Sequence, residues 1–120
     1  MHDKPVVDAA ALDRLREWGG DNLVDQMVRL YIENARSRLE QIDAGLSGEG
    51  EMRVAEMAAH SLKSSAANVG AMRVSAQSAL IEDAAASGDI DAVRTLRDLL
   101  AREIADAERE IRTLVPESEE

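Results

Sequence analysis

Residues 51–70 of this 120-residue chain read EMRVAEMAAHSLKSSAANVG, and this stretch decides the fold. At 100° per residue, one side of a helix over these positions carries small and apolar side chains. They are Ala55, Ala58, Leu62, Ser65 and Val69. We predict a helix over residues 51–69 that packs by this face and ends at Gly70, because glycine readily adopts the left-handed conformation that terminates helices.

The opposite side of the same helix is polar and is the candidate site. It comprises Arg53, Glu56, His60, Lys63, Ser64 and Ala67. Histidine occurs elsewhere only at position 2 and lysine only at position 4, and all remaining basic residues are arginine. A single histidine is usually an ordinary surface or core residue, but here the wheel places His60 on the solvent side with Lys63 one turn later. That pairing of a titratable ring with a cation is typical of functional sites.

Proline and glycine divide the rest of the chain. The two prolines, Pro5 and Pro116, stand at its edges, so no proline interrupts long helices between them. Glycines separate five segments in that stretch. We predict helices over residues 8–18, 21–46, 51–69 and 72–87, and a last helix that runs from a cap at Asp89 to residue 114.

The spacing of apolar residues supports these helices. The second predicted helix, with Asp21 as its expected cap, carries a stripe that begins with Leu23, Met27, Leu30 and Tyr31. The last helix carries a near-heptad stripe of Val93, Leu96, Leu100, Ile104, Ala107, Ile111 and Leu114. We expect an all-α fold: an antiparallel four-helix bundle, with a short additional N-terminal helix that is capped by Asp8 and lies across one end.

The predicted domain spans residues 8–115. We expect an N-terminal tail at residues 1–7 and an acidic, disordered tail at residues 116–120. The initiator methionine and the acidic tail favour a free-standing protein.

Composition excludes several classes of function. The 24 acidic residues outnumber the 14 basic ones, and there is one tryptophan and one tyrosine, so nucleic-acid binding is not expected. The absence of cysteine excludes disulfides, thiolate metal sites and a cysteine nucleophile. The chain shows neither a signal peptide nor an apolar stretch long enough for a membrane span, so we expect a cytoplasmic protein.

Residues 59–71, AHSLKSSAANVGA, resemble the signature of histidine-containing phosphotransfer (HPt) domains, A-H-x-L-K-G-S-(S/A)-x-x-(V/L)-G-A. Residues 12–21, LDRLREWGGD, are similar to the opening helix and turn of bacterial members. Ile81 and Glu82 stand where the family usually has Leu-Glu or a hydrophobic residue followed by Gln, and residues 87–89 match its next turn. The resemblance covers about residues 8–115. One departure is Ser64, where the family most often has a glycine that gives a partner room to approach.

The resemblance implies a carrier in the phosphorelays of bacterial two-component signalling. His60 would accept a phosphoryl group from an aspartyl phosphate on the receiver domain of a hybrid histidine kinase and pass it to the aspartate of a response regulator. The chain would need no cofactor of its own, because Mg²⁺ belongs to the receiver. It would be a monomeric phosphocarrier that acts jointly with receivers, and not an ATP-dependent kinase.

Roles for individual residues follow as hypotheses. His60 would be the nucleophile, Lys63 would offset charge on the phosphoryl oxygens, and Glu82 would accept a hydrogen bond from the second ring nitrogen. The surface that docks the receiver is expected to comprise Leu12, Leu15, Glu56, Ser64 and Ala67. We expect Trp18 to complete the core.

Three alternatives stay open. The chain could be a non-catalytic helical adaptor that binds receivers, although the presence of His60 argues against it. A metal site could use Glu56 and His60, which stand four residues apart, but metal sites in bundles draw carboxylates and histidines from several helices. We therefore expect no metal. Finally, Glu82 could be an ordinary solvated charge on its helix.

Overall fold

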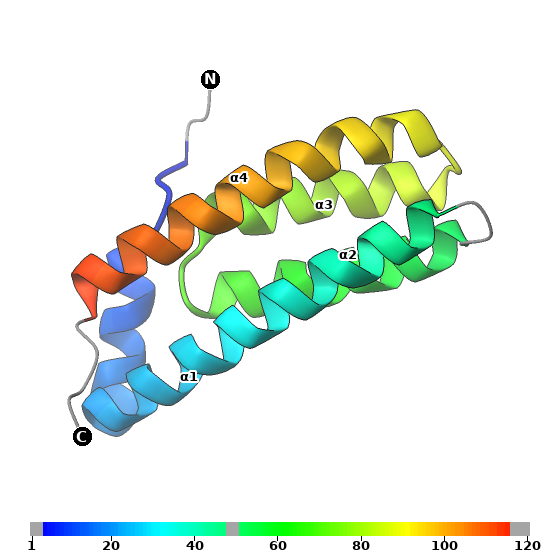
Figure 1. The fold of residues 1–120 in the computed structure, drawn as a ribbon. Helices are drawn as coiled ribbons and strands as arrows, with labels where there is room; N and C mark the ends of the chain where they lie inside the picture. Colours follow the sequence, from blue (N-terminus) through cyan, green and yellow to red (C-terminus); the bar gives the residue numbers. More distant parts are fainter. Residues whose placement is uncertain (1–3, 48–50, 116–120) are drawn as a thin grey trace.

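The computed structural model describes residues 4–47 and 51–115, which form four helices joined by short connections (Figure 1). The helices are α1 (Ala9–Leu46), α2 (Met52–Asn68), α3 (Met72–Ala86) and α4 (Ile90–Leu114). Successive helices run in opposite directions, and the bundle closes because α4 packs against both α3 and α1. The prediction of an all-α antiparallel bundle is confirmed.

Helix α1 is two helices in direct succession. Gly20 breaks it with φ 72° and ψ −169°, a conformation that glycine adopts without a steric penalty. Residues 9–19 therefore lie across one end of the bundle, while the longer remainder runs along it (Figure 1). Asp8 caps the first part by accepting a hydrogen bond from the Ala10 amide at 3.1 Å. The Asp21 carboxylate, expected to cap the second part, instead accepts a hydrogen bond from Arg16 Nε at 2.9 Å.

The turn between α2 and α3 depends on a glycine. Gly70 has φ 79°, and a Cβ at this position would collide with the carbonyl oxygen of Asp8. The two residues are in contact because the Asp8 amide donates to the Gly70 carbonyl at 2.7 Å. The start of α1 is thus fixed to the end of α2, the helix that carries the candidate site.

The N-terminal segment is attached to the bundle from residue 4 onward. The Lys4 carbonyl accepts a hydrogen bond from Arg73 Nε at 2.8 Å, and Val7 is 7% exposed within the core. These contacts join residues that precede α1 to the helices. Residues 1–3 and the predicted acidic tail at 116–120 lie outside the described residues.

Each helix contributes one stripe to the core. The largest fully buried side chains are Tyr31, Leu12, Ile42, Leu62, Ile81, Leu100 and Ile111. In α1 the stripe runs through Val24 and Val28, whereas Leu30 is 61% exposed, so the placement of Leu30 in the core was wrong. The reason is helical phase: with Tyr31 pointing inward, its neighbour Leu30 is turned about 100° away from it.

No helix within residues 4–47 and 51–115 is both long enough and apolar enough to cross a lipid bilayer.

Candidate functional site

His60 lies near the middle of α2 on the face turned away from the core. On the inward face, Ala59 and Leu62 are fully buried and fix the helix against its neighbours. The side chain of His60 is 63% exposed. The predicted exposure of His60 is therefore confirmed, and its imidazole is presented to solvent by a rigid element.

Helix α3 brings Glu82 to this ring. The buried residues of α2 are one leucine and four alanines, and such small side chains allow a neighbouring helix to approach closely: Ala55, Ala58, Ala59, Leu62 and Ala66. The Ser75 hydroxyl joins the two helices by donating to the Lys63 carbonyl at 2.9 Å. Across this contact, Glu82 Oε2 lies 2.7 Å from His60 Nδ1, in the arrangement predicted from the sequence.

Lys63 binds the same carboxylate. Its Nζ lies 2.7 Å from Glu82 Oε1, so the two oxygens of Glu82 hold the imidazole and the ammonium separately. The side chain of Glu82 is 20% exposed and that of Lys63 is 37% exposed, so the pair is partly shielded from water. The pairing of Lys63 with Glu82 was not predicted, because helical phase placed Lys63 beside His60 without fixing the position of α3.

The contacts of Glu82 favour one tautomer of His60. The hydrogen bond from Lys63 lowers the pKa of the Glu82 carboxyl, partial burial opposes this effect, and the hydrogen bond with His60 adds to it. An ionised carboxylate can only accept hydrogen bonds, so its contact with Nδ1 requires a proton on that nitrogen. In the neutral ring with this tautomer, the lone pair is on Nε2.

A hollow of about 440 Å³ opens beside the ring, lined by Glu56, Met57, His60, Ser61 and Glu82. Glu56, predicted to contact a partner, lies in its wall, and Ser64 and Ala67 are exposed farther along α2. Met57, which is 60% exposed, was not among the predicted site residues. Its position three residues before His60 is the signal that could have identified it.

The burial of three residues in the N-terminal helix differs from the predictions. Leu12 and Leu15 are 2% and 6% exposed, so both pack in the core, although Leu15 also lines a surface hollow. Trp18 has the opposite outcome, with 76% exposure where core packing was expected. Leu12 and Leu15 pack the helix against the end of the bundle, and Trp18 lies two residues before the break at Gly20.

Trp18 borders a second hollow on the side of α2. This hollow, of about 350 Å³, lies between the N-terminal helix, the rest of α1 and the end of α2. Its lining comprises Ala11, Arg14, Leu15, Trp18, Met27, Ala67 and Asn68. The predicted docking residue Ala67, on the same helix as His60, thus lines the same hollow as Trp18.

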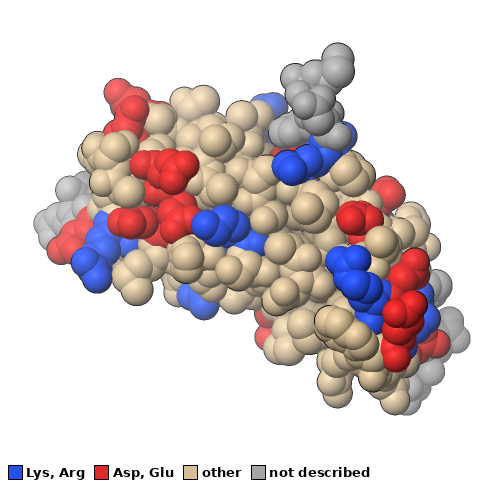
Figure 2. Space-filling view, turned by 180° about the vertical axis from the view of Figure 1, so that it is seen from behind, with Lys and Arg blue, Asp and Glu red and all other residues tan. Residues whose placement is uncertain are grey.

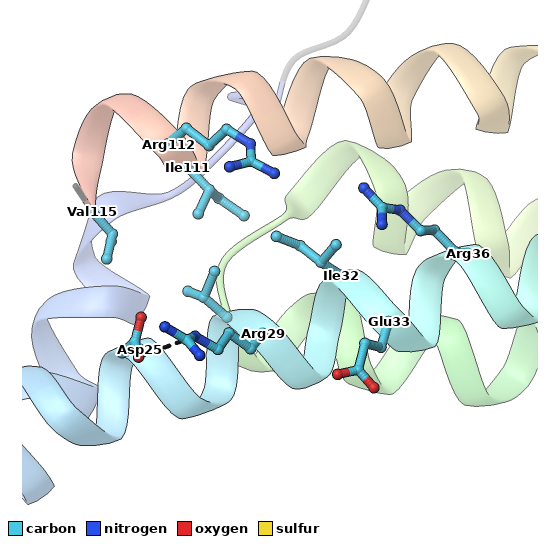
Figure 3. A pocket seen from close by; sticks show the side chains of 9 residues that line it. Asp25, Arg29, Ile32, Glu33, Arg36, Ile111, Arg112 and Val115 are labelled. Atoms are coloured by element: carbon cyan, nitrogen blue, oxygen red, sulfur yellow. Dashed lines mark ion pairs between the residues drawn. The ribbon is translucent and has the colours of Figure 1, made fainter. Parts of the chain in front are cut away.

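A third hollow lies elsewhere, between α1 and the end of α4 (Figure 3). It has a volume of about 270 Å³, and none of the predicted site residues lines it. Two of its charged groups, Arg29 and Asp25, pair with each other at 3.1 Å, and Arg36 pairs at 3.3 Å with Glu108, which lies outside the lining. Apart from Leu12 and Leu15 on α1, the predicted site residues lie on α2 and α3.

One face of the molecule is mixed in charge despite the overall excess of acidic residues. Figure 2 shows acidic and basic side chains in patches, separated by a broad uncharged area. Within residues 4–47 and 51–115, no group of three or more histidine, cysteine or acidic side chains is arranged to hold a metal ion. Glu82 contacts both the imidazole of His60 and the ammonium of Lys63, so the site combines a ring, a carboxylate and a cation.

Comparison with known proteins gives a family and a fold. The family model described as the Hpt domain matches residues 26–110. Among solved structures, histidine-containing phosphotransfer protein B (HptB) from Pseudomonas aeruginosa PAO1 is similar with a TM-score of 0.87 and 21% identity, covering 96% of this chain and 98% of its own.

Two plant proteins are also similar. The histidine-containing phosphotransfer protein ZmHP2 from maize has a TM-score of 0.81 and 23% identity, with 90% of this chain and 81% of its own covered. A putative histidine-containing phosphotransfer protein from rice has a TM-score of 0.81 and 19% identity, with 92% of this chain and 79% of its own covered. These three structures establish the shared fold. A search of curated protein sequences found no match to the chain.

Proposed function

Because the chain belongs to the Hpt domain family, we propose that His60 accepts a phosphoryl group from the aspartyl phosphate of a receiver domain and passes it to the aspartate of a response regulator. The observation that carries this proposal is the geometry of His60. Its ring is exposed on a rigid helix, and Nδ1 lies 2.7 Å from a carboxylate oxygen. Such a ring offers Nε2 to an incoming phosphorus atom.

The covalent intermediate divides one transfer between two aspartates into two simpler steps. In both steps Glu82 holds the proton on Nδ1. In the first step the lone pair on Nε2 is therefore free to attack phosphorus, and in the second step the bond between nitrogen and phosphorus breaks and its electron pair returns to Nε2. The chain then acts as a phosphocarrier jointly with receivers and has no kinase activity of its own. It needs no cofactor, because the Mg²⁺ that assists aspartyl phosphate chemistry belongs to the receiver.

Lys63 would supply positive charge to the phosphoryl group. It lies one turn from His60, its side chain is 37% exposed, and its flexible stem allows the ammonium to reach the phosphoryl oxygens while it stays near Glu82. A cation placed where negative charge gathers stabilises the transfer. We expect Lys63→Ala to leave the fold intact and to slow phosphorylation of His60.

A receiver that reaches His60 would also cover the hollow beside Trp18. A standard interface buries about 800 Å² on each partner, which corresponds to a disc of about 16 Å radius. Ala67 lies seven residues beyond His60, or about 10 Å along the helix axis. We therefore place Glu56, Met57, Ser64, Ala67 and Trp18 in the docking surface of a monomeric carrier.

Transfer of labelled phosphate tests the proposal. A purified receiver carrying ³²P on its aspartate is mixed with the chain, and the label is tested for loss in acid and retention in base, as a phosphoramidate requires. We expect the parent protein and His2→Gln to take up such label and His60→Gln to take up none. Labelling of His60→Gln would contradict the assignment. Receiver binding without labelling of the parent protein would instead identify the chain as an adaptor.

A further inference from the structure

We infer that the negative charge of Glu82, beyond its hydrogen bond to His60, sets how strongly the phosphoryl group is held on this carrier. The inference rests on the proposed function and concerns the equilibrium between carrier and receiver. It begins from the two 2.7 Å contacts of Glu82, one to His60 Nδ1 and one to Lys63 Nζ. An amide could replace the first contact, but only a carboxylate accepts both donors and brings a charge.

The chemical step shows where that charge acts. The Nε2 lone pair of His60 forms a bond to phosphorus, the bond between phosphorus and the aspartyl oxygen breaks, and its electron pair remains on the aspartate as a carboxylate. The proton on Nδ1 stays in place. The ring therefore changes from a neutral imidazole to a phosphorylated imidazolium, and this new positive charge faces Glu82 Oε2 at the 2.7 Å contact.

A fixed negative charge next to a group that becomes positive favours the positive form. The phosphoryl group also brings negative charge, but it is bonded to Nε2, across the ring from Glu82, whereas the imidazolium charge is shared by Nδ1 at the 2.7 Å contact itself. The nearer attraction outweighs the more distant repulsion. Glu82 thus stabilises phosphorylated His60 more than unmodified His60, which moves the equilibrium toward the carrier. The side chain of Glu82 is 20% exposed, so water screens the attraction only in part. A glutamate carboxyl is ordinarily ionised at neutral pH, and the hydrogen bond from Lys63 lowers the pKa of Glu82 further.

Lys63 moderates this effect. Its ammonium sits on the other oxygen of the same carboxylate, and its positive charge offsets part of the negative charge that the ring experiences. Removing the ammonium exposes the ring to the whole charge of Glu82. The contribution of Glu82 to phosphoryl retention should therefore be larger when Lys63 is neutralised.

The test measures the equilibrium distribution of ³²P between the chain and one receiver at fixed Mg²⁺ concentration, approached from both directions. We expect Glu82→Gln to move the distribution toward the receiver about fivefold, the factor that a partly exposed charge pair supplies. When Glu82→Gln is added to Lys63→Met, the distribution should shift toward the receiver, relative to Lys63→Met alone, by more than this factor. Asp83→Asn removes the same charge from the adjacent, exposed position on α3 and should leave the distribution unchanged.

The outcomes separate this inference from the proposed function. If no variant with His60 intact takes up label, the proposed function itself fails. If His60 is labelled in every variant but Glu82→Gln has the distribution of the parent protein, the charge has no role and the inference is overturned. An equal shift in Asp83→Asn would also overturn it, because the effect would then come from overall charge. A slower approach to the same equilibrium would assign Glu82 to orientation alone.

Discussion

Glu82 is the residue that unites the site, because its two oxygens receive donors from two different positions on α2. The helical phase of α2 placed His60 and Lys63 on one exposed face, and the family resemblance indicated Glu82 as a partner of the ring. That Lys63 also binds Glu82 at 2.7 Å depends on the distance between α2 and α3 and on side-chain rotamers. Neither quantity is contained in the spacing of residues along the chain.

The lowered pKa of Glu82 predicts a dependence of stability on pH. Its folded-state pKa lies below the unfolded value, so the ionised carboxylate stabilises the fold above the unfolded pKa, and this stabilisation is lost as pH falls through the folded pKa. We expect Glu82→Gln to lower the free energy of unfolding at pH 7 by at most about 1 kcal/mol. Urea unfolding at pH 7 and in acid should show this difference disappearing in acid. A difference that is the same at both pH values would contradict the linkage.

Trp18 and Leu12 should respond to substitution in opposite ways. Trp18 is 76% exposed, so Trp18→Ala should leave stability unchanged and raise the receiver concentration needed for half-maximal phosphorylation severalfold. Leu99→Ala on α4 is a matched control, since Leu99 is also an exposed apolar residue at 43%. Unchanged kinetics in Trp18→Ala would remove Trp18 from the docking surface.

Leu12 gives the complementary measurement. It is 2% exposed, and Leu12→Ala should lower the free energy of unfolding by about 2–5 kcal/mol, as large-to-small changes in a core do. Leu12 was predicted to be exposed and Trp18 to be buried, and the structure shows the opposite for both. Periodicity shows that leucines share one face of a helix. It does not show which face of the N-terminal helix packs against the end of the bundle.

At the scale of the elements, glycine and proline gave most of the boundaries. The predicted limits of α2, α3 and α4 agree with the structure within a residue or two, because Gly70, Gly88 and the Asp89 cap mark them. The sharp turn at Gly20 is also located by the sequence. The angle of this turn could not be predicted, because the direction of the N-terminal helix depends on how Leu12 and Leu15 pack against the end of the bundle.

Gly70 should be the least replaceable of these glycines. Gly70→Ala forces a side chain into a left-handed conformation and against the Asp8 carbonyl, whereas Gly88, with φ 76°, has open space around it. We expect Gly88→Ala to lose about 1–2 kcal/mol of unfolding free energy, and Gly70→Ala to lose more. Urea midpoints of the two variants test this difference. Equal losses would show that the contact between Asp8 and Gly70 has no energetic weight.

At the scale of the whole molecule, the candidate site lies between α2 and α3, whereas the contacts that close the bundle lie between α1 and α4. His60 and Glu82 face each other across α2 and α3, while Arg97 of α4 joins Asp43 of α1 through two contacts of 2.6 and 2.9 Å. The all-α class and the antiparallel order follow from short connections between amphipathic helices. Cross-helix ion pairs such as Arg97 with Asp43 do not, because they require the register of helices that are distant in sequence.

The position of the phosphate on the intact carrier is the most direct test of the proposed mechanism. The chain is phosphorylated by a receiver, and ³¹P NMR together with mass spectrometry of its peptides assigns the modified atom. Because Glu82 holds the proton on Nδ1, we expect a single phosphoryl group on Nε2 of His60. Phosphate on Nδ1 of His60, or on any other residue, would contradict the mechanism.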